Sequence, residues 1–198
     1  APSPADFVEG PARSIESARE VLSDSFVQKM NMQVEQRHDE RLRLGSADLI
    51  EFSLYIEKLA VTKELEPTIQ TFMDGVSRQL RNVPVVYFRY LPQYLSLVIS
   101  QCAWLPIDKI RGIGFELKNE DPNRIPHLFQ YPEQMEPLKN LMSEVFRISK
   151  FSCFAHQNEN ETLGFLVIFD SLEDENTRAL VQSYKQAFQI AYKRNLLL

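Results

Sequence analysis

Apolar positions in the first third of the chain repeat with helical spacing. Between Ile15 and about Arg43 most residues are strong helix formers, and after an adjacent pair the apolar positions recur every four residues at Val21, Leu22, Phe26, Met30 and Val34. This pattern predicts one long helix with a single apolar stripe. The stripe fades over residues 36–43, where the helix would stand in water or pair with another chain. Residues 1–14 contain three prolines and one glycine, which predicts a flexible leader.

The next segment, residues 46–61, is apolar on two sides. Ser46 is suited to cap a helix at its N-terminus. A helix that is apolar on two sides needs two packing partners: one is its own domain, and the candidate for the other is a second copy of the protein. One face holds Leu49, Phe52, Ile56, Leu59 and Ala60, and the second holds Ile50, Leu54 and Val61.

Beyond residue 65 the spacing alternates between helical and strand-like. Two strands are predicted within 83–105, joined by a turn at 91–93, and two more at 151–157 and 162–170, joined by the polar turn 158–161. Helices are predicted at 66–82, 136–149 and 174–197, the last with Ser171 as its cap. Between them, Gly112 and Gly114 indicate a short strand before a long loop. The last helix would turn these residues inward: Leu180, Val181, Tyr184, Phe188, Ala191 and Tyr192.

Composition narrows the class of protein. With 44% hydrophobic and 25% charged residues, the 198-residue chain is expected to form a packed core. A net charge of −5 and a pI near 5.3 argue against a nucleic-acid partner. The longest apolar stretch is interrupted by Arg89, Pro92 and Gln93, which argues against a membrane span. Cys102 and Cys153 lie in apolar runs, as reduced thiols of a cytoplasmic protein would.

No motif in the sequence indicates catalysis. The chain has no nucleophile elbow, P-loop, HExxH or calcium-loop pattern, so we expect no enzyme activity, no metal and no cofactor. The acidic residues Asp170, Glu173, Asp174 and Glu175 precede a predicted helix, where carboxylates are explained by capping and by the helix dipole.

The C-terminal segment resembles a known family. An apolar strand beginning with Leu-Gly, "LGFLVIF" (163–169), is followed by an acidic turn and a helix ending "QAFQIAYKR" (186–194). GAF domains commonly end in this way, and residues 65–90 are similar to their first junction between helix and strand. The resemblance covers about 46–194. It implies an α+β fold, in which an antiparallel sheet has the N- and C-terminal helices on one face and the loop-rich segment over the other. The domain would span 46–198, preceded by a leader and helical arm at 1–45.

The resemblance also implies a site and a partner. GAF domains often hold a small ligand between the sheet and the covering loops, and many dimerise through their terminal helices. Candidate ligand residues are therefore Arg111, Arg124, His127, Phe129, Tyr131 and Trp104. The candidate dimer interface is Phe26, Met30, Ile50, Leu54 and Val61.

Two interpretations of the function remain open. The first is a sensory or regulatory domain that dimerises, binds a small molecule and acts on an output or partner protein. The second is a structural interaction domain in which Phe129 and Tyr131 fill the space that a ligand would occupy. The stretch "LKNEDPNR" (117–124) lacks the spacing typical of cyclic-nucleotide binders, and the motifs of pigment binders are absent. The sequence therefore names no ligand.

Overall fold

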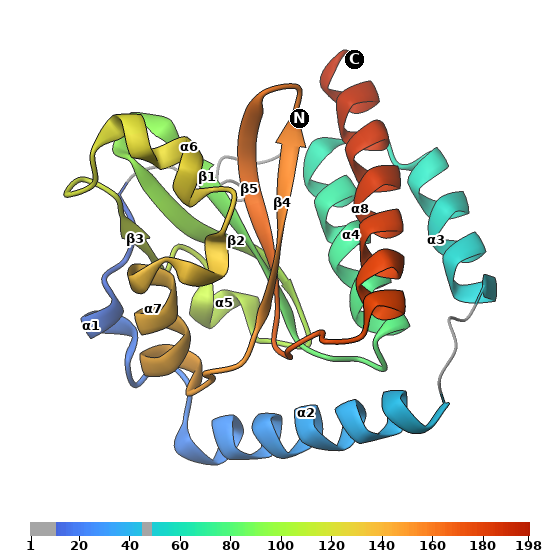
Figure 1. Ribbon diagram of the computed structural model, residues 1–198, viewed down its shortest axis with the longest axis horizontal. Coiled ribbons are helices and arrows are strands. Elements are labelled where there is room, and N and C mark those ends of the chain that lie inside the picture. Colours follow the sequence, from blue (N-terminus) through green and yellow to red (C-terminus); the bar gives the residue numbers. More distant parts are fainter. Residues whose placement is uncertain (1–10, 45–48) are drawn as a thin grey trace.

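A five-stranded antiparallel sheet forms the centre of the molecule. The structure is a computed structural model that describes residues 11–44 and 49–198. The strands lie in the order β3-β2-β1-β5-β4, and every neighbouring pair is antiparallel. Helices cover one face, and a mixture of short helices and loops covers the other (Figure 1). This confirms the predicted α+β architecture. The strands are β1 (Val85–Leu91), β2 (Ser96–Ala103), β3 (Gly114–Glu116), β4 (Ser152–Asn158) and β5 (Glu161–Ile168).

The strands β1 and β5 lie side by side at Gly164 with no room for a side chain. This glycine pairs with Arg89 of β1 and with His156 of β4. A Cβ atom added to Gly164 would lie against the Phe88 carbonyl oxygen and 2.6 Å from the Tyr87 hydroxyl oxygen. Only glycine therefore fits at this position of the strand, where another backbone approaches closely.

Replacement of Gly164 by alanine is expected to destabilise the fold. Because the new methyl group would meet a backbone carbonyl that cannot move without breaking the ladder, Gly164→Ala should lower the free energy of unfolding by about 3 kcal/mol. Urea denaturation of the purified variant measures this value. Thr162→Ala, on the same strand, is the control and should change the stability by less than about 1 kcal/mol. Equal losses in the two variants would contradict the steric explanation.

Three long helices form the layer on one face of the sheet: α3 (Leu49–Val61), α4 (Leu65–Gln79) and α8 (Glu175–Leu196). Phe72 of α4 stacks on Phe188 of α8 with the ring centroids 4.3 Å apart. The Tyr55 hydroxyl donates to the Tyr184 carbonyl at 2.8 Å, which ties α3 to α8. The inward residues predicted for α8 are all buried or half-buried. The layer is thus one packed unit that includes both predicted terminal helices of the domain.

The opposite face carries the short elements. They are α5 (Ile107–Ile110), η3 (Pro122–Arg124), α6 (Ile125–Leu128), η4 (Pro132–Gln134) and α7 (Glu136–Phe146). A further turn, η2 (Pro92–Tyr94), joins β1 to β2. Phe146 of α7 packs edge-on against Phe169, with the centroids 4.8 Å apart. The predicted loop-rich segment therefore does cover this face, as a chain of single turns.

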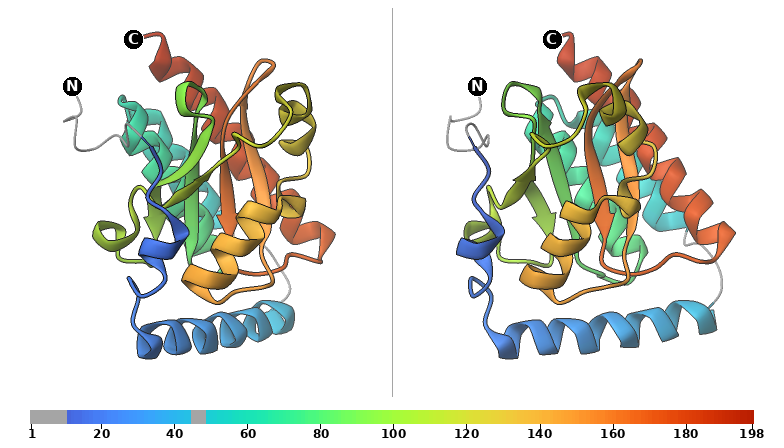
Figure 2. Two further views of the ribbon diagram at one scale, coloured as in Figure 1. Left: turned by 90° about the vertical axis from the view of Figure 1, so that its left-hand side faces the viewer. Right: turned by 60° about the vertical axis from the view of Figure 1, so that its left-hand side comes forward.

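The N-terminal part departs from the prediction of one continuous helix. It forms α1 (Ile15–Ala18) and a separate α2 (Asp24–Leu44), which crosses below the ends of the strands (Figure 2). The Ser23 hydroxyl accepts a hydrogen bond from the Phe26 amide and so starts the second helix. The break lets α1 pack beside α7 before α2 turns away. The segment Ser23-Asp24-Ser25, which is typical of a helix N-terminus, was the signal for this break in the sequence.

Two predicted helix caps have different outcomes. Ser171 is not the cap of α8, because the carboxylate of Asp174 accepts hydrogen bonds from the amides of Asn176 and Thr177 instead. The Thr177 hydroxyl also donates a hydrogen bond to this carboxylate. That bond, followed by the bonds from the backbone amides, lowers the pKa of Asp174. Ser46 lies outside the described residues. The acidic turn thus has the structural role expected of it, with a different residue as the cap.

Candidate functional site

Four of the six predicted ligand residues lie on the segment that covers the far face of the sheet. Arg124, His127, Phe129 and Tyr131 belong to the turns from η3 to η4. Their side chains do not converge. Arg124 and His127 are exposed, Tyr131 is half exposed and packs on the His127 ring, and only Phe129 points into the core.

Phe129 fills the space between the covering segment and the sheet. Its ring lies edge-on to Tyr90 of β1 and to Phe165 of β5, with centroid distances of 4.9 and 5.2 Å, and the residue is 6% exposed. Both partners point to the face opposite α4 and α8. A side chain of the protein therefore stands where the resemblance placed a ligand. Tyr131, the other residue proposed to fill this space, does not.

Arg111 and Trp104 lie away from this segment. Arg111 lines a groove of about 470 Å³ formed with α4 and β2, where its neighbours include Glu66 and Asp74. Trp104 is 61% exposed and has a φ of 65°, an unusual backbone conformation for a bulky residue. The six predicted ligand residues therefore do not form one site.

The two cysteines are separated and protected. Cys102 on β2 and Cys153 on β4 lie in one row across the sheet, with Val86 and Val167 between them. Three strand spacings separate their Cα atoms by about 14 Å. A disulfide needs Cα atoms within about 7 Å, so the two cannot bridge across the sheet. Burial raises the pKa of the Cys102 thiol to about 11, and burial raises the pKa of Cys153 well above its ordinary value. Neither thiol has the character of a nucleophile.

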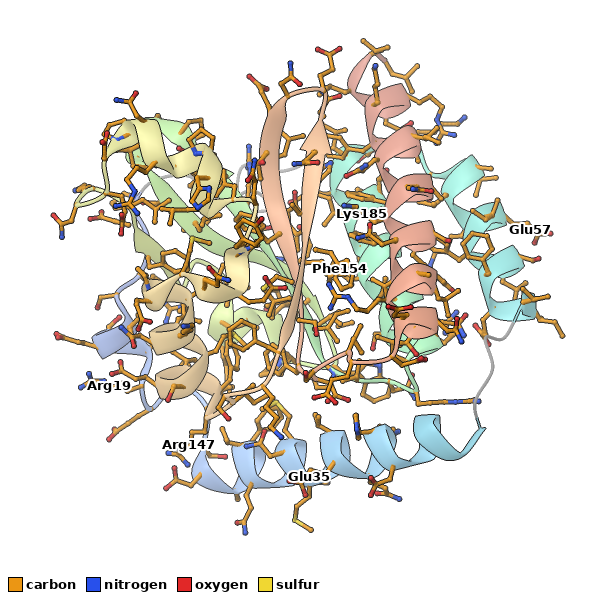
Figure 3. All side chains as sticks on the ribbon, viewed as in Figure 1. Arg19, Glu35, Glu57, Arg147, Phe154 and Lys185 are labelled. Atoms are coloured by element: carbon orange, nitrogen blue, oxygen red, sulfur yellow. The ribbon has the colours of Figure 1, made fainter. Side chains whose placement is uncertain are left out.

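His156 is part of the core between the sheet and α8. Its Nδ1 lies 2.6 Å from the Tyr87 hydroxyl, and its ring contacts Phe188 and Tyr192, each with centroids 4.5 Å apart. Burial, followed by the positive charge of Lys185 on α8 (Figure 3), lowers the pKa of His156 to about 3. The neutral ring is therefore a structural histidine.

The outer side of the helical layer exposes several large apolar side chains. On α3, Tyr55 and Leu59 face the core, while residues on the other sides of the helix face solvent. Met30, which was predicted to join this surface, is 4% exposed and lies in the core of its own chain, and Phe26 is half-buried beside it. We call the following residues the α3–α8 surface: Leu49, Ile50, Leu54 and Val61 of α3 with Ile190 of α8.

Comparison with solved structures identifies the fold. The chain is similar to the crystal structure of the GAF domain from Acinetobacter phosphoenolpyruvate-protein phosphotransferase, with a TM-score of 0.55 over 76% of this chain and 95% of that chain. This chain has the fold of a GAF domain. The two sequences are 9% identical, so the similarity concerns the fold alone. No protein-family model matches the sequence, and no curated protein matches it either.

In this GAF-fold chain a cleft of about 600 Å³ lies between α2 and the adjoining ends of β4 and β5. With α2 regarded as its roof, we call it the cleft beneath α2. Its roof is α2, and its walls are the links on either side of the β4–β5 hairpin, residues 147–150 and 169–173. His38 Nδ1 lies 3.0 Å from the Asp170 carboxylate, and the Asn31 amide donates to the Arg147 carbonyl at 3.3 Å. Sequence reasoning did not single out this cleft. The fading apolar stripe of α2 was its only signal.

Other kinds of site find no support in the described part of the chain. Over residues 11–44 and 49–198, no group of three or more His, Cys, Asp or Glu side chains is arranged to hold a metal ion. Over the same residues, no helix is both long and apolar enough to cross a membrane. The α3–α8 surface and the cleft beneath α2 are therefore the features from which we argue a function for this GAF fold.

Proposed function

We propose that the chain is a non-catalytic regulatory domain of the cytoplasm that forms a homodimer through the α3–α8 surface. The observation that carries this proposal is the exposure of apolar side chains along α3, where Ile50 is 71% and Val61 73% exposed. Ile50, Leu54 and Val61 are spaced four and seven residues apart and so share one face of α3, and exposed apolar side chains grouped in this way mark interaction sites more often than scattered ones do. The opposite side of α3 is already packed through Tyr55 and Leu59, so a second copy supplies the second partner that the helix needs.

The filled space beneath the covering segment supports regulation through protein contacts. Because Phe129 occupies the position between Tyr90 and Phe165, the domain needs no small ligand there to complete its core. Its signal would pass between the dimer helices and an output or partner protein. Two arrangements of α3 and α8 with different affinities for that partner would be enough.

Charged residues on the α3–α8 surface are expected to separate the dimer. In Ile50→Glu/Leu54→Glu, carboxylates would have to be buried without partners at the contact, so the dimer dissociation constant should rise about 100-fold or more. Sedimentation equilibrium over a range of concentrations measures the constant. Circular dichroism of the same samples shows that the fold is retained.

The matched control lies on α2, outside the α3–α8 surface. Met32 is 64% exposed, and Met32→Glu should leave the dissociation constant unchanged. A wild-type protein that stays monomeric at about 100 μM would refute the homodimer. A dimer that survives Ile50→Glu/Leu54→Glu would show that another surface forms the contact.

A further inference from the structure

The cleft beneath α2 exists because α2 changes its mode of packing along its length. Its first half is held by the buried residues Val27, Met30 and Val34. Its second half is held by polar contacts: Arg37 donates to the Arg81 carbonyl at 2.9 Å, and His38 pairs with Asp170. The space of about 600 Å³ is within the usual range for a ligand site.

One wall of the cleft, residues 147–150, continues through Phe151 into the edge strand β4. Residues 149–151 lead into the edge strand β4 without belonging to the ladder. Within the described part of the chain, the amides and carbonyls of Ser149, Lys150 and Phe151 have no backbone partner. Such a stretch is a template for pairing with an extended peptide. Three residues in an extended conformation span about 10 Å, and the eight residues from Asn31 to His38 on the roof, separated by seven helical rises, also span about 10 Å.

The floor and the charges of the cleft favour a particular kind of peptide. Val34 and Ile148 are 9% and 8% exposed and give the base a small apolar surface, whereas Phe169 there is fully buried. Among the described lining residues, acidic side chains outnumber the basic pair Arg147 and Lys150. Asp170 is paired with His38 and Arg147 with Asp24, which leaves Glu35, Asp39 and Glu173 against Lys150. A basic side chain in the ligand would therefore be attracted. The acidic lining residues are Glu35, Asp39, Asp170 and Glu173.

We propose that the cleft beneath α2 binds an extended peptide segment of about three residues that carries a basic side chain. The segment would pair with the backbone of residues 149–151 and place its basic side chain near Glu35 and Glu173. This inference adds a kind of partner to the proposed regulatory function and does not depend on the dimer. Because α2 is followed in the chain by α3, peptide binding at α2 would also affect the helix that contributes most of the α3–α8 surface.

The test uses capped peptides and NMR of the full chain. Acetyl-Ala-Ala-Lys-Ala-Ala-amide should shift the backbone amide signals of Ser149, Lys150 and Phe151 in a saturable way at millimolar concentration. The Glu35→Gln/Glu173→Gln variant should bind it about fivefold more weakly, as loss of exposed ion pairs predicts. The matched control Glu57→Gln/Glu161→Gln removes the same charge from α3 and from the far end of the hairpin, and should bind like the wild type (Figure 3).

Two further peptides make each outcome decisive. The same peptide with Glu in place of Lys should bind at least about fivefold more weakly, and a version with N-methylated backbone amides should lose most of its affinity. Saturable shifts confined to residues other than 149–151, or none up to about 20 mM, would overturn the proposal. Equal binding of the Lys and Glu peptides would overturn its charge preference. None of these results bears on sedimentation of the wild-type dimer, so the two proposals fail independently.

Discussion

Phe129→Ala is expected to destabilise the fold by about 3–5 kcal/mol and to create a cavity that accepts small apolar molecules. The ring is buried between Tyr90 and Phe165, so its removal takes away both edge-on contacts and leaves a void that a packed sheet cannot close. Urea denaturation measures the loss. Addition of indole should then raise the melting temperature of the variant but not of the wild type, because only the variant has the empty space.

Tyr131→Ala is the matched control, since it removes an aromatic ring from the same segment. Tyr131 is 50% exposed, so its loss should cost less than about 1 kcal/mol and should not create an indole site. Stabilisation of the wild type by indole would mean that the space beneath the segment is open already. The interpretation of Phe129 as the residue that fills it would then be wrong.

The order of helices and strands could be predicted because each element has a clear hydrophobic period. The two hairpins and α4, α7 and α8 lie close to their predicted positions. The buried side of α3 was harder. One predicted apolar face held Leu49, Phe52, Ile56, Leu59 and Ala60, but Leu49 and Ile56 are exposed. Tyr55, which belonged to neither predicted face, is buried and donates a hydrogen bond to the Tyr184 carbonyl of α8. When a helix is apolar on all sides, the elements that pack against it decide which sides are buried.

The site was less predictable than the fold, because convergence of side chains depends on tertiary placement. Phe129 and Tyr131 stand two residues apart on one segment, yet one ring enters the core and the other remains half exposed. Arg111 follows the single turn α5, whose position turns it toward α4 rather than toward the covering segment. Ile190 gave a usable signal: it is an apolar residue outside the inward stripe of α8, which marks an exposed surface.

His156 is expected to make the stability of the protein fall as the pH drops below about 6.5. Because the pKa of His156 in the folded state is lowered to about 3, the unfolded chain binds a proton on this ring at pH values where the folded chain does not. Above pH 6.5 the ring is neutral in both states and contributes no pH dependence. Between pH 6.5 and pH 3 the free energy of unfolding should fall by up to about 1.4 kcal/mol per pH unit from this group.

The variant His156→Asn isolates this contribution. Asparagine retains a polar group near the Tyr87 hydroxyl but does not titrate, so the variant should be less stable at pH 7 and should lose less stability on acidification. Urea denaturation at pH 7, 6, 5 and 4 gives both slopes. Gln157→Asn, a neighbouring change on β4 that alters no titratable group, should keep the wild-type slope. Since acidic residues shared by all three proteins cancel in the comparison, identical slopes for His156→Asn and the wild type would mean that the folded state admits the proton. The ring would then lie in a wetter environment than the packing of Phe188 and Tyr192 around it implies.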